Sequence, residues 1–118
     1  MSADDPRAAA LKFKEMATEK FKAGEFQIAR YTYGSAMEVA EKNGLTDIWV
    51  DCKNNYALAA IKDRRYDLAA RALEEVLSKK PTNVKARLRL GQCCLETMDF
   101  DRAIELFTRL SEEESVCN

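Results

Sequence analysis

Apolar and small residues recur along this chain at the three- to four-residue spacing of one face of an α-helix. The pattern pauses at short polar stretches, one of which holds Asn43-Gly44, a pair typical of a helix end. The chain is rich in Ala, Leu, Glu, Lys and Arg, and it has only 4 Gly and 2 Pro, which also favours helix. The pattern therefore predicts an all-α protein with helices at about 7–23, 26–42, 47–63, 66–79, 84–97 and 100–113.

Three segments of the chain align with one another: KAGEFQIARYTYGSAMEVA, KDRRYDLAARALEEVL and ETMDFDRAIELFTRL. Each has an aromatic residue, an alanine three positions later, and an apolar or aromatic residue four positions after that. The matching sets are Phe26/Ala29/Tyr33, Tyr66/Ala69/Leu73 and Phe100/Ala103/Phe107. Tyr66 and Phe100 are 34 residues apart, whereas Phe26 and Tyr66 are 40 apart, so the first interval holds six additional residues. Internal repeats of this length predict stacked helix pairs.

Small residues in matching positions predict that the two helices of each pair approach closely. They are Ala17, Ala57 and Gly91 in the first helices and Ala29, Ala69 and Ala103 in the second. The aromatic residues of the repeats are expected in the core and not on a surface that stacks bases; these are Phe13, Phe26, Tyr33, Tyr66, Phe100 and Phe107. Trp49 is likewise expected in helix packing.

The 34-residue interval, the aromatic–alanine pattern and Pro81 after the second repeat resemble tetratricopeptide repeat (TPR) domains over nearly the whole chain. The resemblance implies three helix-turn-helix repeats stacked as a short right-handed solenoid with a concave inner face. We expect a single domain over residues 1–118, with repeats at about 7–42, 47–80 and 84–115. The additional residues are expected near 41–47.

Composition excludes several classes of function. Lys and Arg number 19 against 20 Asp and Glu, and this net charge of −1 argues against a nucleic-acid or membrane-surface protein. The chain has no histidine, and its glycines are scattered, which excludes histidine-based catalysis and a phosphate-binding loop. We therefore expect no enzymatic activity, no cofactor and no metal site.

The cysteines and the N-terminus indicate a cytoplasmic protein. Cys52, Cys93, Cys94 and Cys117 form no CxxC motif and have no regular spacing, so we expect reduced thiols, with Cys94 packed and not reactive. The N-terminal sequence MSADDPRAAA is acidic where a signal peptide would be basic. No apolar run approaches the length of a membrane span.

A second resemblance concerns the inner face of the predicted solenoid. Co-chaperones that bind the C-terminal EEVD tails of heat-shock proteins 90 and 70 hold the terminal aspartate with a two-carboxylate clamp on three TPRs. In that family the first repeat supplies Lys and Asn, the second Asn, and the third Lys and Arg, at fixed offsets before each repeat aromatic. The corresponding residues of this chain are Lys14, Thr18, Asn55, Lys85 and Arg89. Four of the five residue types match.

Thr18 departs from the asparagine of the clamp family. The large TPR immunophilins tend to carry Thr there, in a KEKGT run similar to KFKEMAT of this chain, and they have a longer joint between the first two repeats. The chain therefore resembles immunophilin-type TPR domains, although it contains no prolyl-isomerase domain.

The clamp resemblance implies a role for each residue. Lys14 and Asn55 would contact the main-chain carboxylate of a terminal aspartate, and Lys85 and Arg89 its side-chain carboxylate. Lys85 and Arg89 stand four apart on one helix, where like charges repel unless a ligand offsets them. Arg87 is expected to be solvated on another face.

Two alternatives to the clamp remain open at this point. The clamp residues can be ordinary solvated groups, in which case the chain is a scaffold TPR that assembles a complex through its convex face or its insertion. The chain can also be the regulatory part of an enzyme.

The last predicted helix raises a separate point. TPR arrays usually end with an additional helix, so the apolar face of helix 100–113, with Ile104 and Phe107, should lack cover. We expect self-association through this helix or membership of a longer protein.

Overall fold

Six α-helices make up the described part of the protein. The computed structural model describes the backbone of residues 5–117 and the side chains of residues 5–110 and Glu112. The helices are α1 (Pro6–Lys22), α2 (Phe26–Lys42), α3 (Thr46–Lys62), α4 (Tyr66–Lys79), α5 (Val84–Glu96) and α6 (Phe100–Cys117). Their ends lie within one residue of the prediction, apart from the end of α6, which continues past 113. The predicted all-α fold is confirmed.

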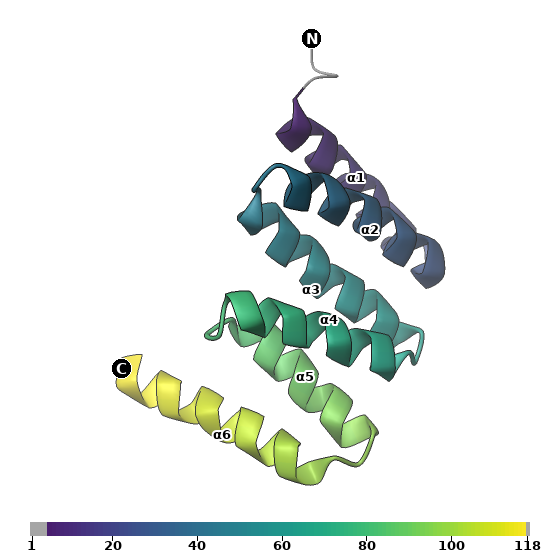
Figure 1. Cartoon of the computed structure of the whole chain (residues 1–118). Helices are drawn as coiled ribbons and strands as arrows, with labels where there is room; N and C mark the ends of the chain where they lie inside the picture. Colours follow the sequence, from purple (N-terminus) through teal and green to yellow (C-terminus); the bar gives the residue numbers. More distant parts are fainter. Residues whose placement is uncertain (1–4, 118) are drawn as a thin grey trace.

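The helices stack in chain order into an elongated array of 49 × 30 × 21 Å (Figure 1). Each helix packs on the next one along the chain, and α3 also contacts α1 and α5. Among the described residues, α2, α4 and α6 do not pack helix on helix with one another, although Arg102 of α6 forms an ion pair with Glu74 of α4. The odd-numbered helices therefore form the inner layer of a curved helical solenoid, and the even-numbered helices form its outer layer.

The same three-residue turn connects four of the five helix pairs. Its middle residue has a left-handed backbone, with φ of 80° at Gly24, 66° at Gly44, 58° at Arg64 and 63° at Met98. Its last residue donates from the backbone N–H to a carbonyl in the preceding helix, as Glu25 does to Lys20 at 2.9 Å. This bond satisfies a carbonyl that the helix end leaves open. The turns before α2 and α3 use glycine, which adopts this conformation without strain.

The connection from α4 to α5 is different. It spans residues 80–83 and contains Pro81, which cannot continue a helix. Asn83 then caps α5, because its side-chain oxygen accepts a hydrogen bond from the Ala86 N–H at 2.9 Å. This cap fixes where α5 starts.

The six additional residues of the first repeat interval are taken up as helix. Helix α2 has 17 residues against 14 in α4, which accounts for three. Helix α3 starts 20 residues before Tyr66, whereas α5 starts 16 before Phe100, which accounts for four more. The connection between α2 and α3 is one residue shorter than that between α4 and α5. The joint is therefore compact, with about one added turn on each helix.

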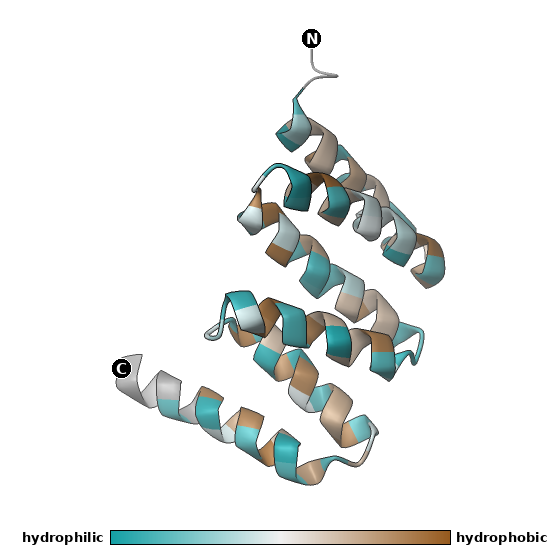
Figure 2. Ribbon diagram, viewed as in Figure 1, coloured by the Kyte–Doolittle hydropathy of each residue, from teal (hydrophilic) through white to brown (hydrophobic). Residues whose placement is uncertain are grey.

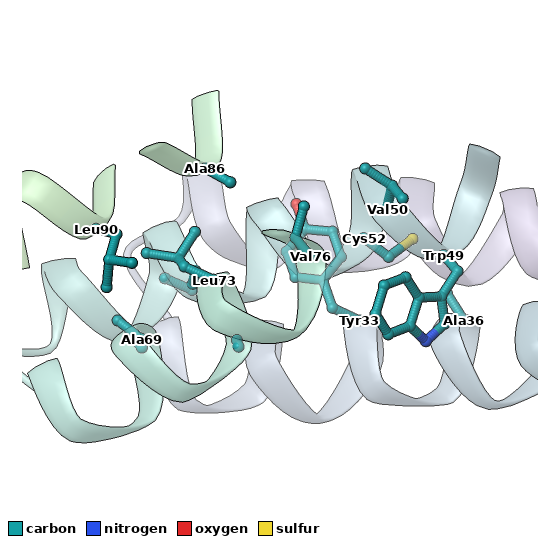
Figure 3. Packing of buried hydrophobic residues seen from close by; sticks show 14 of the residues in the cluster. Tyr33, Ala36, Trp49, Val50, Cys52, Ala69, Leu73, Val76, Ala86 and Leu90 are labelled. Carbon is teal, nitrogen blue, oxygen red and sulfur yellow. The ribbon is translucent and has the colours of Figure 1, made fainter. Parts of the chain in front are cut away.

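Hydrophobic and hydrophilic residues alternate along the helices (Figure 2), and the hydrophobic ones meet between neighbouring helices. The small residues expected at the contacts are all buried: Ala17, Ala29, Ala57, Ala69, Gly91 and Ala103. At Gly91 a Cβ atom would lie 2.5 Å from the Phe107 ring, so α5 and α6 meet where only glycine fits. Figure 3 shows larger residues such as Leu73 and Leu90 filling the space between these contacts.

Trp49 lies in the core, as predicted, and is 6% exposed. The ammonium of Lys79 at the end of α4 lies 4.0 Å from the centre of its ring, and that of Lys53 lies 5.3 Å away. Cations over an indole face are attracted by its π electrons. Trp49 therefore joins the added turn of α3 to α4.

The prediction that all repeat aromatics are buried is wrong for Phe100, which is 54% exposed at the start of α6. Its counterparts Phe26 and Tyr66 pack against the core, because a further helix follows each of their pairs. In the described chain no helix follows α6. Ile104 is 63% exposed, as expected, but Phe107 packs partly against the core and does not lie open.

The thiols of Cys52, Cys93 and Cys94 are free and buried. Burial raises the pKa of Cys52 and Cys93 to about 11, and it also raises the pKa of Cys94. These groups stay protonated at neutral pH and act as small packed residues. The side chain of Cys117 lies outside the described residues. Over the part of the chain that the structure describes, no helix has the length and apolarity to cross a membrane.

Candidate functional site

A hollow of about 360 Å³ opens on the inner layer, between α1, α3 and α5. Its volume is near the lower end of the roughly 300–1,000 Å³ typical of ligand pockets. The residues that line it are Lys14, Asp51, Asn54, Asn55, Asn83, Val84 and Lys85. Three of the five predicted clamp residues, Lys14, Asn55 and Lys85, are therefore brought together from three helices that are distant in sequence.

Helix α1 supplies Lys14. Its side chain is 30% exposed, and its Nζ lies 3.3 Å from Oδ2 of Asp51 on α3. Lys14 is on the face of α1 that leans toward α3, because Ala10 and Ala17 on either side of it are buried. The first wall of the hollow thus carries a cation whose position is set by helix packing.

Helix α3 supplies the floor of the hollow. Asn55 is half-buried, and Asn54 next to it is 4% exposed. The Asn54 amide nitrogen donates to Oδ1 of Asn83 at 3.3 Å, while its own side-chain oxygen is buried and has no hydrogen-bond partner among the described residues. A buried amide oxygen without a donor is unfavourable by about 1–3 kcal/mol. Burial of Asn54 at the hollow therefore lowers the free energy of unfolding of the protein.

Helix α5 supplies the third wall. Lys85 is exposed and lines the hollow, whereas Arg89 lies one turn further along, outside the lining. Nη1 of Arg89 donates to the backbone carbonyl of Asn54 at 3.0 Å. Burial lowers the pKa of this guanidinium, which nevertheless stays charged at neutral pH. The bond uses one of the five N–H donors of arginine and holds the side chain between α3 and α5.

Thr18 is the predicted clamp residue that departs most from its expected role. It does not line the hollow. Its hydroxyl donates to the Lys14 carbonyl at 2.9 Å and shares a second hydrogen bond of 2.9 Å with the Tyr33 hydroxyl on α2. Thr18 therefore joins α1 to α2 behind Lys14, and its single O–H donor is engaged inside the protein.

The prediction that Arg87 is solvated is wrong. Arg87 is 7% exposed. A residue two positions from Lys85 and two from Arg89 points to the other side of α5, and here that side faces α4 and α6. Arg87 lines a second hollow of about 240 Å³ together with Leu77, Pro81, Arg102, Glu105, Leu106 and Arg109. The long apolar stem of arginine makes such burial possible.

Sequence reasoning missed four residues that line the first hollow: Asp51, Asn54, Asn83 and Val84. Two of them had a readable signal. Asp51 lies four residues before Asn55, which is the spacing of one helix face. Asn83 directly precedes a helical run, where an asparagine cap is expected. The buried contacts of Asn54 had no signal, because they depend on how closely α3 and α5 approach.

The charge of the hollow is positive although the chain as a whole is slightly negative. Lys14 and Lys85 face one carboxylate, that of Asp51, and three neutral amides. Val84 adds an apolar wall and is 59% exposed. A site of this kind favours an anionic group carried on a small apolar body.

The array of helix pairs with a hollow on its inner layer defines a helical repeat protein. Residues 60–116 match the family model described as tetratricopeptide repeat. The predicted resemblance to tetratricopeptide repeats is confirmed over these residues, and the fold of the chain is that of a tetratricopeptide-repeat domain.

Solved structures of similar fold include the second TPR of Spaghetti (RPAP3), bound to the HSP90 peptide SRMEEVD. The two chains are 19% identical with a TM-score of 0.75, over 92% of this chain and 94% of that one. The N-terminal domain of stress-induced protein-1 (STI-1) from C. elegans is 21% identical with a TM-score of 0.74. That match covers 90% of this chain and 84% of the other. At these identities the likeness concerns the fold.

Proposed function

We propose that this protein binds the free C-terminal end of an acidic EEVD-type peptide, of the kind found at the end of heat-shock proteins 90 and 70. It would act as a cytoplasmic co-chaperone module that recruits the chaperone and catalyses no reaction itself. The observation that carries the proposal is the convergence of Lys14, Asn55 and Lys85 on one hollow. The peptide SRMEEVD in the structure of the similar RPAP3 domain supports the choice of ligand.

Each residue takes a role that follows from its position. Lys14 and Asn55 lie on the α1 and α3 sides of the hollow and bind the main-chain carboxylate of the terminal aspartate. Lys85 and Arg89, one turn apart on α5, bind its side-chain carboxylate through charge-assisted hydrogen bonds. Thr18 acts indirectly, since it holds the turn that carries Lys14.

A peptide titration tests the proposal. The peptide MEEVD should bind, and the same peptide with a C-terminal amide should bind about tenfold more weakly or worse, because the amide removes one of the two carboxylates. Affinity should fall as salt is added, since exposed ionic contacts are screened. Equal binding of the acid and the amide would contradict the clamp and favour the scaffold alternative.

Substitution on α5 tests the residue assignments. Arg89→Ala should weaken MEEVD binding about tenfold or more, or about 1.4 kcal/mol, because it removes a forked donor for the carboxylate. Arg71→Ala is the matched control, since Arg71 is an exposed arginine on α4 that lines neither hollow. Thermal melts of both variants are needed, because Arg89 also bonds to the Asn54 carbonyl. If the two variants bind the peptide equally well, Arg89 has no part in the site.

A scaffold function remains the second candidate. It is favoured by the exposed apolar residues near the C-terminal end of the array, where Leu95, Met98, Phe100 and Ile104 are between 46% and 76% exposed. Surfaces of this type often mark contacts with other proteins. A scaffold would use that face and would be indifferent to a free carboxylate in the hollow.

A further inference from the structure

Asp51 is the one carboxylate among the residues that line the hollow, and the clamp as described gives it no role. It lies one turn before Asn55 on α3, so the two side chains leave the same face of the helix. Its Oδ2 lies 3.3 Å from the Nζ of Lys14. The cation assigned to the ligand therefore already has a carboxylate beside it.

We propose that Asp51 competes with the ligand for Lys14 and thereby sets the affinity of the site. The Asp51 side chain contacts the Lys14 Nζ that the main-chain carboxylate of the ligand would approach. This inference rests on the function proposed above, because it concerns the same hollow and the same peptide end.

The geometry favours displacement of Asp51 by the ligand. The Asp51 side chain is 60% exposed, so it can turn toward solvent when another anion arrives. Lys14 is only 30% exposed and is held by the packing of α1. When Asp51 turns away, its ion pair with Lys14 is lost, and this loss weakens binding.

The pair also offsets repulsion between the cations of the hollow. Lys14 and Lys85 line the same hollow, and like charges that share a site repel one another. Asp51 reduces that repulsion, and a ligand that displaces it must supply the compensating carboxylate itself. Asp51 therefore stabilises the folded chain and lowers its affinity for the peptide.

Removing the charge of Asp51 tests the inference. Asp51→Asn keeps the shape of the side chain and should tighten MEEVD binding about two- to fivefold at low salt, which is the size expected for a partly exposed ion pair. The matched control is Asp47→Asn. Asp47 lies one turn earlier on α3, pairs with Arg7 at 2.6 Å and does not line the hollow. The control should bind like the parent chain.

A double-mutant cycle locates the effect. In a Lys14→Ala background Asp51→Asn should give no gain, because the cation for which Asp51 competes is absent. The same gain with and without Lys14 would overturn the inference, since Asp51 would then act by general repulsion of an acidic peptide. An unchanged or weakened affinity of Asp51→Asn in the parent background would overturn it too.

The outcomes separate this inference from the proposed function. If the parent chain does not distinguish MEEVD from its amide, the proposed function fails, and the competition fails with it. If the parent chain binds MEEVD in a Lys14-dependent way while Asp51→Asn binds no better, only the competition fails. Thermal melts of all variants check that they fold alike, which is expected because both aspartates are exposed.

Discussion

Helices α3 and α6 have similar lengths but very different surroundings. Helix α3 packs against α1, α2, α4 and α5, whereas the described part of α6 packs on α5 and reaches α4 through the ion pair of Arg102 with Glu74. Eight residues of α3 are buried, and among the described side chains of α6 only Ala103 is. The hollow takes three lining residues from the enclosed helix, while the open helix carries exposed apolar residues. In this array the enclosed helix supplies the floor of the hollow, and α6 supplies none of the lining residues described for it.

The largest effect is expected from overpacking next to the enclosed helix. Ala69→Leu places a branched side chain where α4 meets its neighbours and should lower the free energy of unfolding by about 1–3 kcal/mol. Ala103→Leu on α6 should be less destabilising by about half, because no helix in the described part of the chain packs on the far side of α6, which can therefore shift away from α5. Urea unfolding of both variants gives the two values, and Arg71→Leu at an exposed position of α4 is the control. Equal losses at Ala69 and Ala103 would mean that the two regions are equally rigid.

A smaller and opposite effect is expected in the turns. Arg64 follows α3 and Met98 precedes α6, and both have φ near 60°. Glycine adopts this conformation without the steric cost of a side chain, so Arg64→Gly and Met98→Gly should each stabilise the turn by about 0.5–1 kcal/mol.

Hydrogen exchange of the α6 amides shows whether α6 unfolds together with the rest of the array or separately from it. If both glycine variants raise the global free energy of unfolding equally, α6 unfolds together with the rest. If only Arg64→Gly raises it, while Met98→Gly slows exchange in α6 alone, α6 opens as a separate unit. A loss of stability in both variants would contradict the assigned turn geometry.

The smallest effect on stability is expected at the exposed apolar end. Ile104→Ser should change the free energy of unfolding by no more than about 0.5 kcal/mol, because the residue packs against little. The same change should abolish self-association through this face, which the sequence predicts as one of two possibilities, the other being that the chain is part of a longer protein. Sedimentation over a range of protein concentrations measures it. A parent chain that stays monomeric at high concentration would contradict self-association through this face.

Most of the fold could be predicted because the repeats constrain it several times over. Phe26, Tyr66 and Phe100 fixed the spacing, and the alanines beside them fixed which faces meet. The same reasoning placed Phe100 in the core, which was wrong. Whether a repeat residue is buried depends on whether a further helix packs over it. The residue's own position within its repeat does not reveal this.

The candidate site was predictable only in part. Lys14, Asn55 and Lys85 were found because each occupies a fixed offset within its repeat, and the structure brings these offsets to one hollow. The offsets did not indicate where the hydroxyl of Thr18 would find its partner, nor that Arg87 would be covered. Both depend on contacts between helices: Thr18 bonds to Tyr33 on α2, and Arg87 lies against residues of α4 and α6.

The added turns of α2 and α3 limit which length changes such an array can accept. Three extra residues rotate the continuing helix by about 300° and four by about 400°, so each returns the apolar face to within about 60° of its former direction. An addition of two or five residues would swing that face toward water. Insertions into the helices at this joint are therefore expected in steps of about one helical turn, because only these keep the apolar face directed at its neighbours. The three residues added to α2 and the four added to α3 each obey that rule.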